Sequence, residues 1–567
     1  MKRVYFTLAL MSLFGGLNAF ADVKQDGVVY DKMPDGKCFV VGYDEATMPE
    51  NGIVTIANTI NIDGTDYTVT GILGSEDYTA YNNGKTGDDR AAFFNCKKII
   101  GLRFADGSDV TLIGDHAFKS CTNLKTIENI PSTLQDIQKW CFEGTALESV
   151  DLSQTKLQYL PNGCFYNCRQ LKEVKLPSTL TTPNSGNWVE ADDAKYGKQA
   201  FSETAIESID LTNTQLISLG DYMFADCQKL MTVKLPSTLK YIWNHAFCNS
   251  SLSSITFPRS LQKIDAWAFQ GAKFANVVIP TQCSSIEQGA FIDNANLTTV
   301  VINGLKCYLA YQAFCNCSKL TDVYITSKEK PVVERYGFPF NKDLKVHVMK
   351  DFVDIFYGLK TSETYNPCNA KSFDSNLSLT LGKEWTTFTS AYNLDFSNNV
   401  EGGLTAYAAK YNKDNDAVAL TPVKKVKAHT GLILKGEAGK TYTLPILASD
   451  EAGLEAVTDN QLVDCVDAVW SSSHDKDYFL FNGKFVKSEN AGWALPGKSY
   501  LYISSGRRPN NSESPLRVYV DNTATAINGI TNNPVVKDEA YYNLQGVKVQ
   551  RPQHGVFIHN GKKVVLK

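Results

Sequence analysis

A charge imbalance is absent from this 567-residue sequence, which carries 60 acidic and 56 basic residues and a net charge of −4. Nucleic-acid-binding domains present a basic stripe, so this balance argues against a nucleic-acid partner. Long apolar runs are also absent beyond residue 21, because no later stretch reaches the roughly 18 uninterrupted apolar residues typical of a membrane-spanning helix. The sequence therefore predicts no transmembrane segment.

Motifs of catalysis and metal binding are missing as well. The seven histidines are scattered, and there is no Gly-x-Ser-x-Gly elbow, phosphate loop or His-Glu-x-x-His helix. Cys315 and Cys317 lack the second pair or nearby histidine of a zinc site. The run from Asn412 to Asp416 resembles a calcium loop but lacks its later Gly and Glu, which favours a hairpin tip. We predict no catalytic, cofactor or metal residues, although a site assembled from distant residues remains an alternative.

One phrase recurs ten times between residues 92 and 325. Clear copies are Ile113-Gly-Asp-His-Ala-Phe-Lys-Ser-Cys-Thr-Asn-Leu124 and Leu219-Gly-Asp-Tyr-Met-Phe-Ala-Asp-Cys-Gln-Lys-Leu230. Its phenylalanine, called the anchor below, recurs every 22 to 25 residues with one interval of 36. A fixed period of this length is typical of a solenoid. The anchors are Phe93, Phe118, Phe142, Phe165, Phe201, Phe224, Phe247, Phe269, Phe291 and Phe314.

Apolar residues occupy fixed positions in each repeat. An aliphatic residue stands five positions before the anchor, and the residue directly before the anchor is usually small. After the anchor, apolar and polar residues alternate, as around Leu230, Val233 and Leu235, which fits a half-buried strand. One repeat buries too little apolar surface to fold alone, so we expect the repeats to stack and their strands to form a parallel sheet.

The full phrase reads aliphatic-Gly-x-x-Ala-Phe-x-x-Cys-x-x-Leu-x-x-Val-x-Leu-Pro-Ser-Thr-Leu. It resembles the BspA-like class of leucine-rich repeats, found in surface proteins of Bacteroides relatives. The ten copies cover about two fifths of the chain. The resemblance implies a surface-exposed binding protein, adhesins among them, and supplies no catalytic residues.

The fold class predicted from these patterns is mainly β with short helices or turns. A leucine-rich-repeat solenoid of about ten repeats is followed by a β-sandwich-like domain. Residues 1–21 combine two basic residues, an apolar run and an Ala-Phe-Ala end, which indicates a cleaved secretory signal and an extracellular or cell-surface location. The predicted divisions are a signal peptide at 1–21, an N-terminal β cap at 22–72, the solenoid at 73–325, a C-terminal cap at 326–359, a linker at 360–372, the β domain at 373–521, a linker at 522–539 and a tail at 540–567.

Fourteen cysteines in an exported chain invite a disulfide interpretation. Several of them, however, share one repeat position, three residues after the anchor. A recurring position of this kind favours a small buried side chain that packs under each coil, so we expect mostly reduced, structural cysteines. The five at this position are Cys96, Cys121, Cys168, Cys227 and Cys317.

Two polar excursions interrupt the repeat at residues 74–90 and 182–198. Insertions in solenoids become loops on one edge and often carry recognition residues, although a tolerated surface insertion is the alternative. Because binding hot spots favour Trp, Tyr and Arg, the candidate partner-binding residues of the excursions are Tyr78, Tyr81, Trp188 and Tyr196.

The polar residues that alternate with the buried strand residues should point outward from the sheet. Of this set, which runs from Thr126 to Tyr324, only Tyr324 is a hot-spot type, so Tyr324 is the remaining candidate partner-binding residue. For most of the face we expect plain solvation. If the solenoid binds protein, its loops should matter more than its sheet.

Residues 373–521 show β alternation without the 23-residue repeat, which indicates a sandwich or barrel. Phrases such as Gly431-Leu-Ile-Leu434 resemble a β module at the ends of Bacteroidetes surface proteins. Trp385, Trp470 and Trp493 are candidates for a sugar platform, although buried tryptophans are commoner in β sandwiches. The tail resembles C-terminal sorting signals of the type IX secretion route, which implies attachment outside the cell.

Three hypotheses of function follow. The first is a non-catalytic, adhesin-like surface protein that binds a host or neighbouring-cell protein. The second is a carbohydrate-binding protein that contacts glycans through the β domain. The third is a structural spacer without a ligand. No cofactor is expected in any of them.

Overall fold

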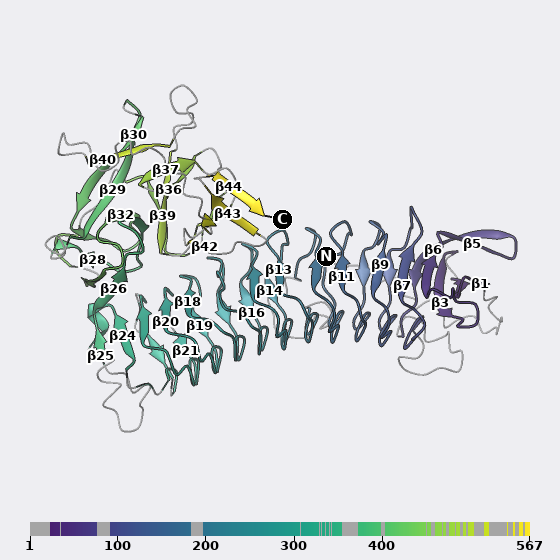
Figure 1. Ribbon diagram of the computed structural model, residues 1–567. Coiled ribbons are helices and arrows are strands. Elements are labelled where there is room, and N and C mark those ends of the chain that lie inside the picture. The colour runs from purple at the N-terminus through teal and green to yellow at the C-terminus, as the bar shows by residue number, and fades with distance from the viewer. Residues whose placement is uncertain are drawn as a thin grey trace.

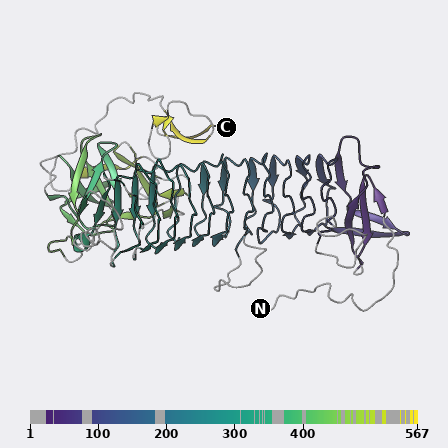
Figure 2. The same cartoon turned by 90° about the horizontal axis from the view of Figure 1, so that it is seen from below.

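The computed structural model describes residues 23–75, 91–182, 197–353, 372–503 and 515–520, apart from short gaps, together with four strands between residues 541 and 566. Stacked coils form a long rod, and a β domain lies against its C-terminal end (Figure 1). The orthogonal view shows the coils in a single row, with the N-terminal sheet at the opposite end (Figure 2). The predicted fold class, a β solenoid followed by a sandwich-like β domain, is confirmed.

The first row of parallel strands contains the predicted strand after nine of the ten anchors, all but Phe247, and it begins with a strand that precedes the first anchor. The register of this row places equivalent residues side by side, so that Val150 lies opposite Val174 and Asp151 opposite Lys175. The strands are β4 (Ile53–Ile56), β7 (Gly101–Phe104), β9 (Thr126–Glu128), β11 (Ser149–Asp151), β12 (Glu173–Lys175), β13 (Ser208–Asp210), β15 (Thr232–Lys234), β18 (Asn276–Ile279), β20 (Thr299–Ile302) and β22 (Asp322–Ile325).

A second row of parallel strands, each of two residues, was not predicted. It contains the aliphatic residue five positions before the anchor, which points into the core, as buried Ile242 does. The strands are β8 (Leu112–Ile113), β10 (Asp136–Ile137), β14 (Ser218–Leu219), β16 (Tyr241–Ile242), β17 (Lys263–Ile264), β19 (Ser285–Ile286) and β21 (Tyr308–Leu309). The two rows hydrogen-bond neighbouring coils to one another, and each row is divided into shorter sheets along the rod.

The ten anchors form the spine of the core. Every anchor from Phe93 to Phe314 is at most 2% exposed. Each ring stacks on the next, with centroids 5.0 to 5.7 Å apart and planes within 14° of parallel. This separation is close to the roughly 4.8 Å between neighbouring strands. The rings therefore fill the core between coils, which explains why the phenylalanine recurs in every repeat.

The recurring cysteines are buried as expected and also serve as hydrogen-bond donors. Four of the five thiols donate to the carbonyl oxygen of the anchor in the preceding coil, whereas the Cys96 thiol contacts the sulfur of Met48. Burial raises the pKa of Cys227 to about 11, so the thiol keeps its proton. Asn294 holds the equivalent position in its coil and donates to the carbonyl of Phe269 over 2.8 Å. The thiol distances are 2.9 Å for Cys121, 3.1 Å for Cys168, 3.0 Å for Cys227 and 3.2 Å for Cys317.

The N-terminal cap is built from antiparallel strands that merge into the rod. Strands β1 (Val23–Gln25), β2 (Val28–Lys32) and β3 (Cys38–Tyr43) pair in succession, and β3 then pairs in parallel with β6 (Thr65–Ile72). The predicted hairpin is present, since β5 (Thr59–Ile62) pairs with β6 around Asp63 and Gly64, both at positive φ. Strands β4 and β6 already belong to the two parallel rows, so the first coil begins inside the predicted cap.

The rod continues beyond Ile325, where the sequence predicts a cap. Strand β23 (Val332–Val333) extends the second row and β24 (Lys345–Val348) the first. Phe338, which is 1% exposed, stands five residues after Val333 as an anchor does. A short 3₁₀ helix, η3 (Lys350–Phe352), follows, and β25 (Ser372–Asp374) then pairs in parallel with β24. The first strand after the predicted linker is thus still part of the rod.

The β domain is built around a five-stranded sheet in the order β27-β32-β29-β30-β40. Both faces of this sheet are buried: Leu432 and Leu434 of β32 face one apolar cluster and Ile433 faces another. The four-stranded sheet β34-β39-β36-β37 packs on the Ile433 side. Asn412 and Asp416 lie at the tip of the β29–β30 hairpin, as predicted.

The remaining strands belong to the β domain and to the C-terminal tail. They are β26 (Asn376–Thr380), β27 (Trp385–Phe388), β28 (Leu394–Asp395), β29 (Thr405–Asn412), β30 (Ala417–Val423), β31 (Lys425–Val426), β32 (Leu432–Lys435), β33 (Thr441–Pro445), β34 (Leu462–Cys465), β35 (Val469–Ser471), β36 (Asp477–Phe481), β37 (Lys484–Lys487), β38 (Gly492–Ala494), β39 (Lys498–Tyr502), β40 (Arg517–Val520), β41 (Tyr541–Tyr542), β42 (Lys548–Val549), β43 (Gly555–His559) and β44 (Lys562–Leu566). The last four form a small antiparallel sheet.

Candidate binding surface

The outward side chains of the first row carry paired charges over the N-terminal and middle coils. Facing residues on neighbouring strands form ion pairs, and their side chains are between 46% and 67% exposed. Exposed pairs of this kind contribute little to stability, and each pair is electrically neutral. This part of the sheet agrees with the predicted solvated face. The pairs are Arg103–Glu128 at 2.6 Å, Asp151–Lys175 at 3.4 Å and Asp210–Lys234 at 2.7 Å.

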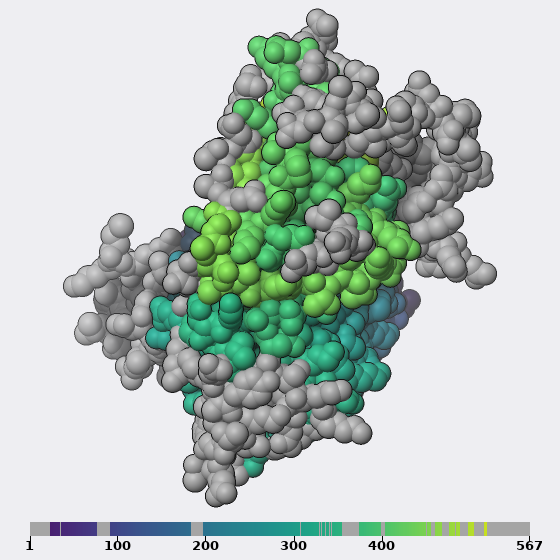
Figure 3. Space-filling model, turned by 90° about the vertical axis from the view of Figure 1, so that its left-hand side faces the viewer, coloured from purple at the N-terminus to yellow at the C-terminus, as the bar shows by residue number. Residues whose placement is uncertain are grey.

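Toward the C-terminal end the same outward column turns apolar. Val278, Val301 and Tyr324 occupy it in successive coils. The β domain covers this end of the sheet: Tyr324 belongs to the apolar cluster that contains Leu432 and Leu434, and Val301 packs against that cluster. Figure 3, which looks at this end of the molecule, shows the β domain lying directly on the last coils.

The prediction that Tyr324 is a partner-binding residue is therefore wrong. Its side chain does point outward from the sheet, but only 6% of it is exposed. Burial raises its pKa to about 12, so the phenol stays neutral. The partner of Tyr324 lies within the same chain, because residues more than 50 positions later fold back onto it.

Polar contacts fix the β domain on the rod. Asp467, which is 5% exposed, accepts a hydrogen bond of 2.8 Å from the backbone nitrogen of Thr281. The side-chain amide of Asn303 donates to the carbonyl of Val466 over 3.3 Å. Arg259 lies 4.0 Å from the Asp467 carboxylate. This end of the rod is consequently occupied by an intramolecular interface.

The other four candidate residues, Tyr78, Tyr81, Trp188 and Tyr196, lie outside the described residues. The residues that flank them are described, and they show where the excursions leave the rod. Ile72 pairs with Ile113 in the second row just before the first excursion. The hydroxyl of Thr182, just before the second, donates to the carbonyl of Ser218 in the same row. Both excursions thus leave from one corner of the coil, between the second row and the anchor.

This corner carries an aromatic stack that sequence reasoning missed. Tyr222, His245 and Trp267 each stand two residues before an anchor, at positive φ, and their side chains are partly exposed. The His245 ring lies 4.6 Å from that of Tyr222 and 5.1 Å from that of Trp267. Trp267 in turn covers Gly289, where an added Cβ would lie 2.7 Å from the indole. The sequence feature that could have indicated this stack is the shared position of the three rings, each two residues before an anchor.

The stacking geometry limits what these rings can bind. A sugar platform needs a free ring face, but here the faces are turned toward neighbouring coils and only ring edges reach the surface. Between the two excursions the same corner carries Trp140, which packs edge-on against Tyr166 at 5.8 Å. Amphipathic rings with exposed edges are more typical of protein interfaces.

A Ser-Asp-His cluster lies at the base of the first excursion. Ser75 donates to Asp115, and Nδ1 of His116 lies 2.8 Å from Asp115 and 3.2 Å from Ser75. In a hydrolytic triad the serine and the carboxylate contact different imidazole nitrogens, whereas here both contact Nδ1. The cluster therefore does not have the arrangement of a charge relay. No group of three or more potential metal ligands occurs among the residues that the structure describes.

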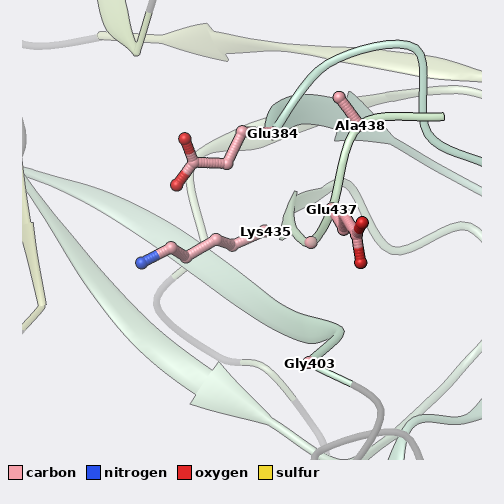
Figure 4. A pocket seen from close by; sticks show the side chains of 6 residues that line it. Glu384, Gly403, Lys435, Glu437 and Ala438 are labelled. Atoms are coloured by element: carbon pink, nitrogen blue, oxygen red, sulfur yellow. The ribbon is translucent and has the colours of Figure 1, made fainter. Parts of the chain in front are cut away.

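The three tryptophans of the β domain lie in two different sheets, with Trp385 on β27 in the five-stranded sheet. Trp470 and Trp493 pair across β35 and β38, but their side chains lie outside the described part of the chain. Trp385 is partly buried, with Tyr407 at 6.0 Å and the Lys435 ammonium 5.1 Å from its ring. Beside it lies a shallow hollow of about 480 Å³, lined by Glu384, Lys435 and Glu437 among others (Figure 4).

Comparison with known proteins identifies the class of the repeat. A family model described as BspA type leucine rich repeat region matches six copies over residues 89–189 and 194–331. The repeats of this chain are therefore BspA-type leucine-rich repeats, as their resemblance implied. No curated protein matches the chain. The part of the chain that the structure describes includes no helix with the length and apolar character needed to cross a membrane.

Several solved structures are similar to the rod. A leucine-rich repeat protein from Bacteroides ovatus is 17% identical over 58% of this chain and 88% of its own, with a TM-score of 0.40. A leucine rich cell surface protein from Faecalibacterium prausnitzii is 17% identical over 63% and 95%, with a TM-score of 0.35. The pneumococcal vaccine antigen PcpA is 16% identical over 62% and 98%, with a TM-score of 0.31.

Proposed function

We propose that this protein is exported to the cell surface and binds a macromolecular partner, most simply a protein of a host or neighbouring cell, without catalysis. The BspA-type repeats support a binding role. The rod supplies a rigid scaffold, since neighbouring coils are held together by two rows of strands and a continuous ring stack.

The observation that carries the proposal is the common corner of the two excursions. Their flanking residues, Ile72 and Thr182, lie in the same row, four coils apart. Trp140 and Tyr166 present ring edges in the coils between them. Aromatic residues are the commonest hot spots of protein interfaces. The sheet face is a weaker choice, because its charges are paired and its C-terminal end is covered.

A deletion that leaves the rod regular tests this proposal. Pro183 and Gly197 correspond to Leu219 and Gly220, which are adjacent in the next repeat, so removal of residues 184–196 joins two positions that are consecutive in a regular coil. The interval from Phe165 to Phe201 then falls from 36 to 23 residues, which is within the normal range.

The mature protein, residues 22–539, and this deletion variant would be tested for binding to arrays of host matrix proteins and of glycans. We expect protein binding by the intact chain and a loss of at least about tenfold in affinity on deletion, equivalent to about 1.4 kcal/mol. An unchanged melting temperature would show that the rod is intact. Protein binding that survives the deletion would contradict the proposed corner, and silence on both arrays would favour the spacer.

The carbohydrate hypothesis stays as the second candidate because of the hollow beside Trp385. Glycan binding that is unaffected by the deletion and lost in Trp385→Ala would move the function to the β domain. The Lys435 ammonium over the Trp385 ring already occupies a position that a sugar would need, so we favour the protein partner.

A further inference from the structure

A buried histidine joins the rod to the β domain. His347 lies on β24 in the last coil and is 3% exposed. Its Nε2 lies 3.0 Å from a carboxylate oxygen of Asp322 on β22, and its Nδ1 lies 2.6 Å from a carboxylate oxygen of Asp374 on β25. The ring stacks on Tyr324 with centroids 4.3 Å apart. Three strands therefore converge on one imidazole.

The hydrogen-bond pattern requires a charged ring. A neutral imidazole has one N–H donor, whereas two ionised carboxylates can only accept. Both nitrogens must donate, which makes His347 an imidazolium. Burial opposes this charge, but the hydrogen bonds and charges of Asp322 and Asp374 outweigh it, and the pKa of His347 is raised. The hydrogen bond from His347 lowers the pKa of Asp322. At Asp374 burial acts to raise the pKa, but the hydrogen bond from His347, the charge of that ring, the backbone hydrogen bond from Asn376 and the charge of Lys345 together outweigh it, and the pKa is again lowered.

The other titratable groups facing the ring do not change in the same range. Tyr324 of β22, with its raised pKa of about 12, stays neutral. Lys345 on β24 lies close enough to help hold both carboxylates ionised. From the β domain, the Tyr392 hydroxyl donates to the His347 carbonyl over 3.1 Å. Among the described residues around this ring, His347 is the group that titrates nearest neutral pH.

The position of the His347 ring means that its charge affects how firmly β25 is held on the last coil. Strand β25 is the first strand after the segment that leaves the last coil, and it pairs with β24 over only three residues. Asp374, at the end of that pairing, precedes β26 of the β domain. We propose that His347 is a protonation-controlled clasp: its charged ring holds β25 and the adjoining β domain on the rod, and its neutral ring releases them.

The direction of the effect follows from linkage. A histidine with a folded-state pKa above its unfolded value stabilises the contact fully below the unfolded pKa, about 6.5, and loses this contribution as the pH rises through the folded pKa. The junction should therefore be tight in mildly acidic solution and loosen in alkaline solution. Release would uncover the apolar column of Val301 and Tyr324.

Two measurements on the mature protein test the clasp. Nitrogen-15 labelling of the five histidines in residues 22–539, with His347 assigned by its absence in His347→Gln, should show a ring protonated at both nitrogens at pH 6 and a midpoint above 6.5. Hydrogen exchange, corrected for the intrinsic effect of pH, should show protection of residues 372–380 falling about tenfold more than that of residues 230–235 between pH 6 and pH 9.

Controls separate the clasp from general effects. His347→Gln should lower the protection of residues 372–380 at pH 6 to the level that the parent protein shows at pH 9 and so remove the pH response, whereas His245→Gln, in the middle of the rod, should keep it. If His347→Gln does not fold, Asp374→Asn should still move the His347 midpoint downward. A singly protonated ring at pH 6, or equal protection of residues 372–380 at both pH values, would overturn the proposal.

Discussion

The two ends of the first row have the same backbone and opposite surroundings. Lys234 lies on β15 and Tyr324 lies on β22. Both point outward from the first row, at equivalent positions of strands that pair in the same parallel register. Lys234 is paired with Asp210 and its side chain is 67% exposed, while Tyr324 is 6% exposed under the β domain. The coil geometry is common to both, so the outward side chains decide whether the sheet stays in water or receives another domain.

This difference teaches where a partner has room to bind. An outward column of paired charges keeps the sheet soluble and discourages edge or face association. An apolar column must be covered, and here the chain itself provides the cover. The aromatic corner and the residues that flank the excursions lie on a different side of the coil and are not affected by either arrangement.

The largest effect is expected from a substitution that disrupts the contact between the β domain and the C-terminal end of the sheet. Tyr324→Ala removes a buried ring that stacks on His347 and packs in the apolar cluster of the β domain. Truncation of a large buried aromatic costs about 3 to 5 kcal/mol. We expect the β domain to lose its contact with the rod, measured as an earlier, separate transition in urea unfolding. A free-energy change below about 1 kcal/mol would contradict the assigned interface.

A second test asks whether the thiol hydrogen bonds in the core contribute equally to stability under the exposed and the covered parts of the sheet. Cys227→Ala beneath the exposed half and Cys317→Ala beneath the covered half each remove a thiol donor from an anchor carbonyl. Each should lower the unfolding free energy by about 1 to 3 kcal/mol. Cys227→Thr is the matched control, because threonine occupies this position at Thr145 and Thr204. An equal loss in the threonine variant would show that packing, not hydrogen bonding, selects cysteine.

The smallest expected effect comes from the exposed end. Lys234→Ala removes one member of an exposed ion pair, so we expect a loss of less than about 1 kcal/mol. Salt should weaken the interaction further, which makes the difference between variant and parent vanish at high ionic strength. A loss as large as that of Tyr324→Ala would mean that the two ends of the sheet are energetically alike.

Several elements could be read from the sequence because they depend on local spacing. The anchor positions, the strand after every anchor other than Phe247 and the hairpin at Asp63 and Gly64 were predicted and are present. The last coil was missed although Phe338 keeps the spacing, because Asn341 replaces the usual cysteine and Gly337 the usual alanine.

The candidate site was predictable only in part. The aromatic stack at the corner was missed although Tyr222, His245 and Trp267 share one position relative to the anchor, because they are more than 20 residues apart and differ in type. The sequence also could not show that a later domain covers Tyr324. The stack depends on which coils are neighbours, and the burial of Tyr324 depends on where the later β domain folds back onto the rod.

By itself, the sequence determined the period, the buried anchor and the alternating strand, because a repeat that cannot fold alone must place the same residues inward in every coil. Only the tertiary structure decided which outward residues remain exposed. It brought Asp374 and Tyr392 back to His347 and turned an apolar column into an interface. The physical reason is that inward burial follows from local periodicity, whereas exposure depends on contacts between residues far apart in the chain.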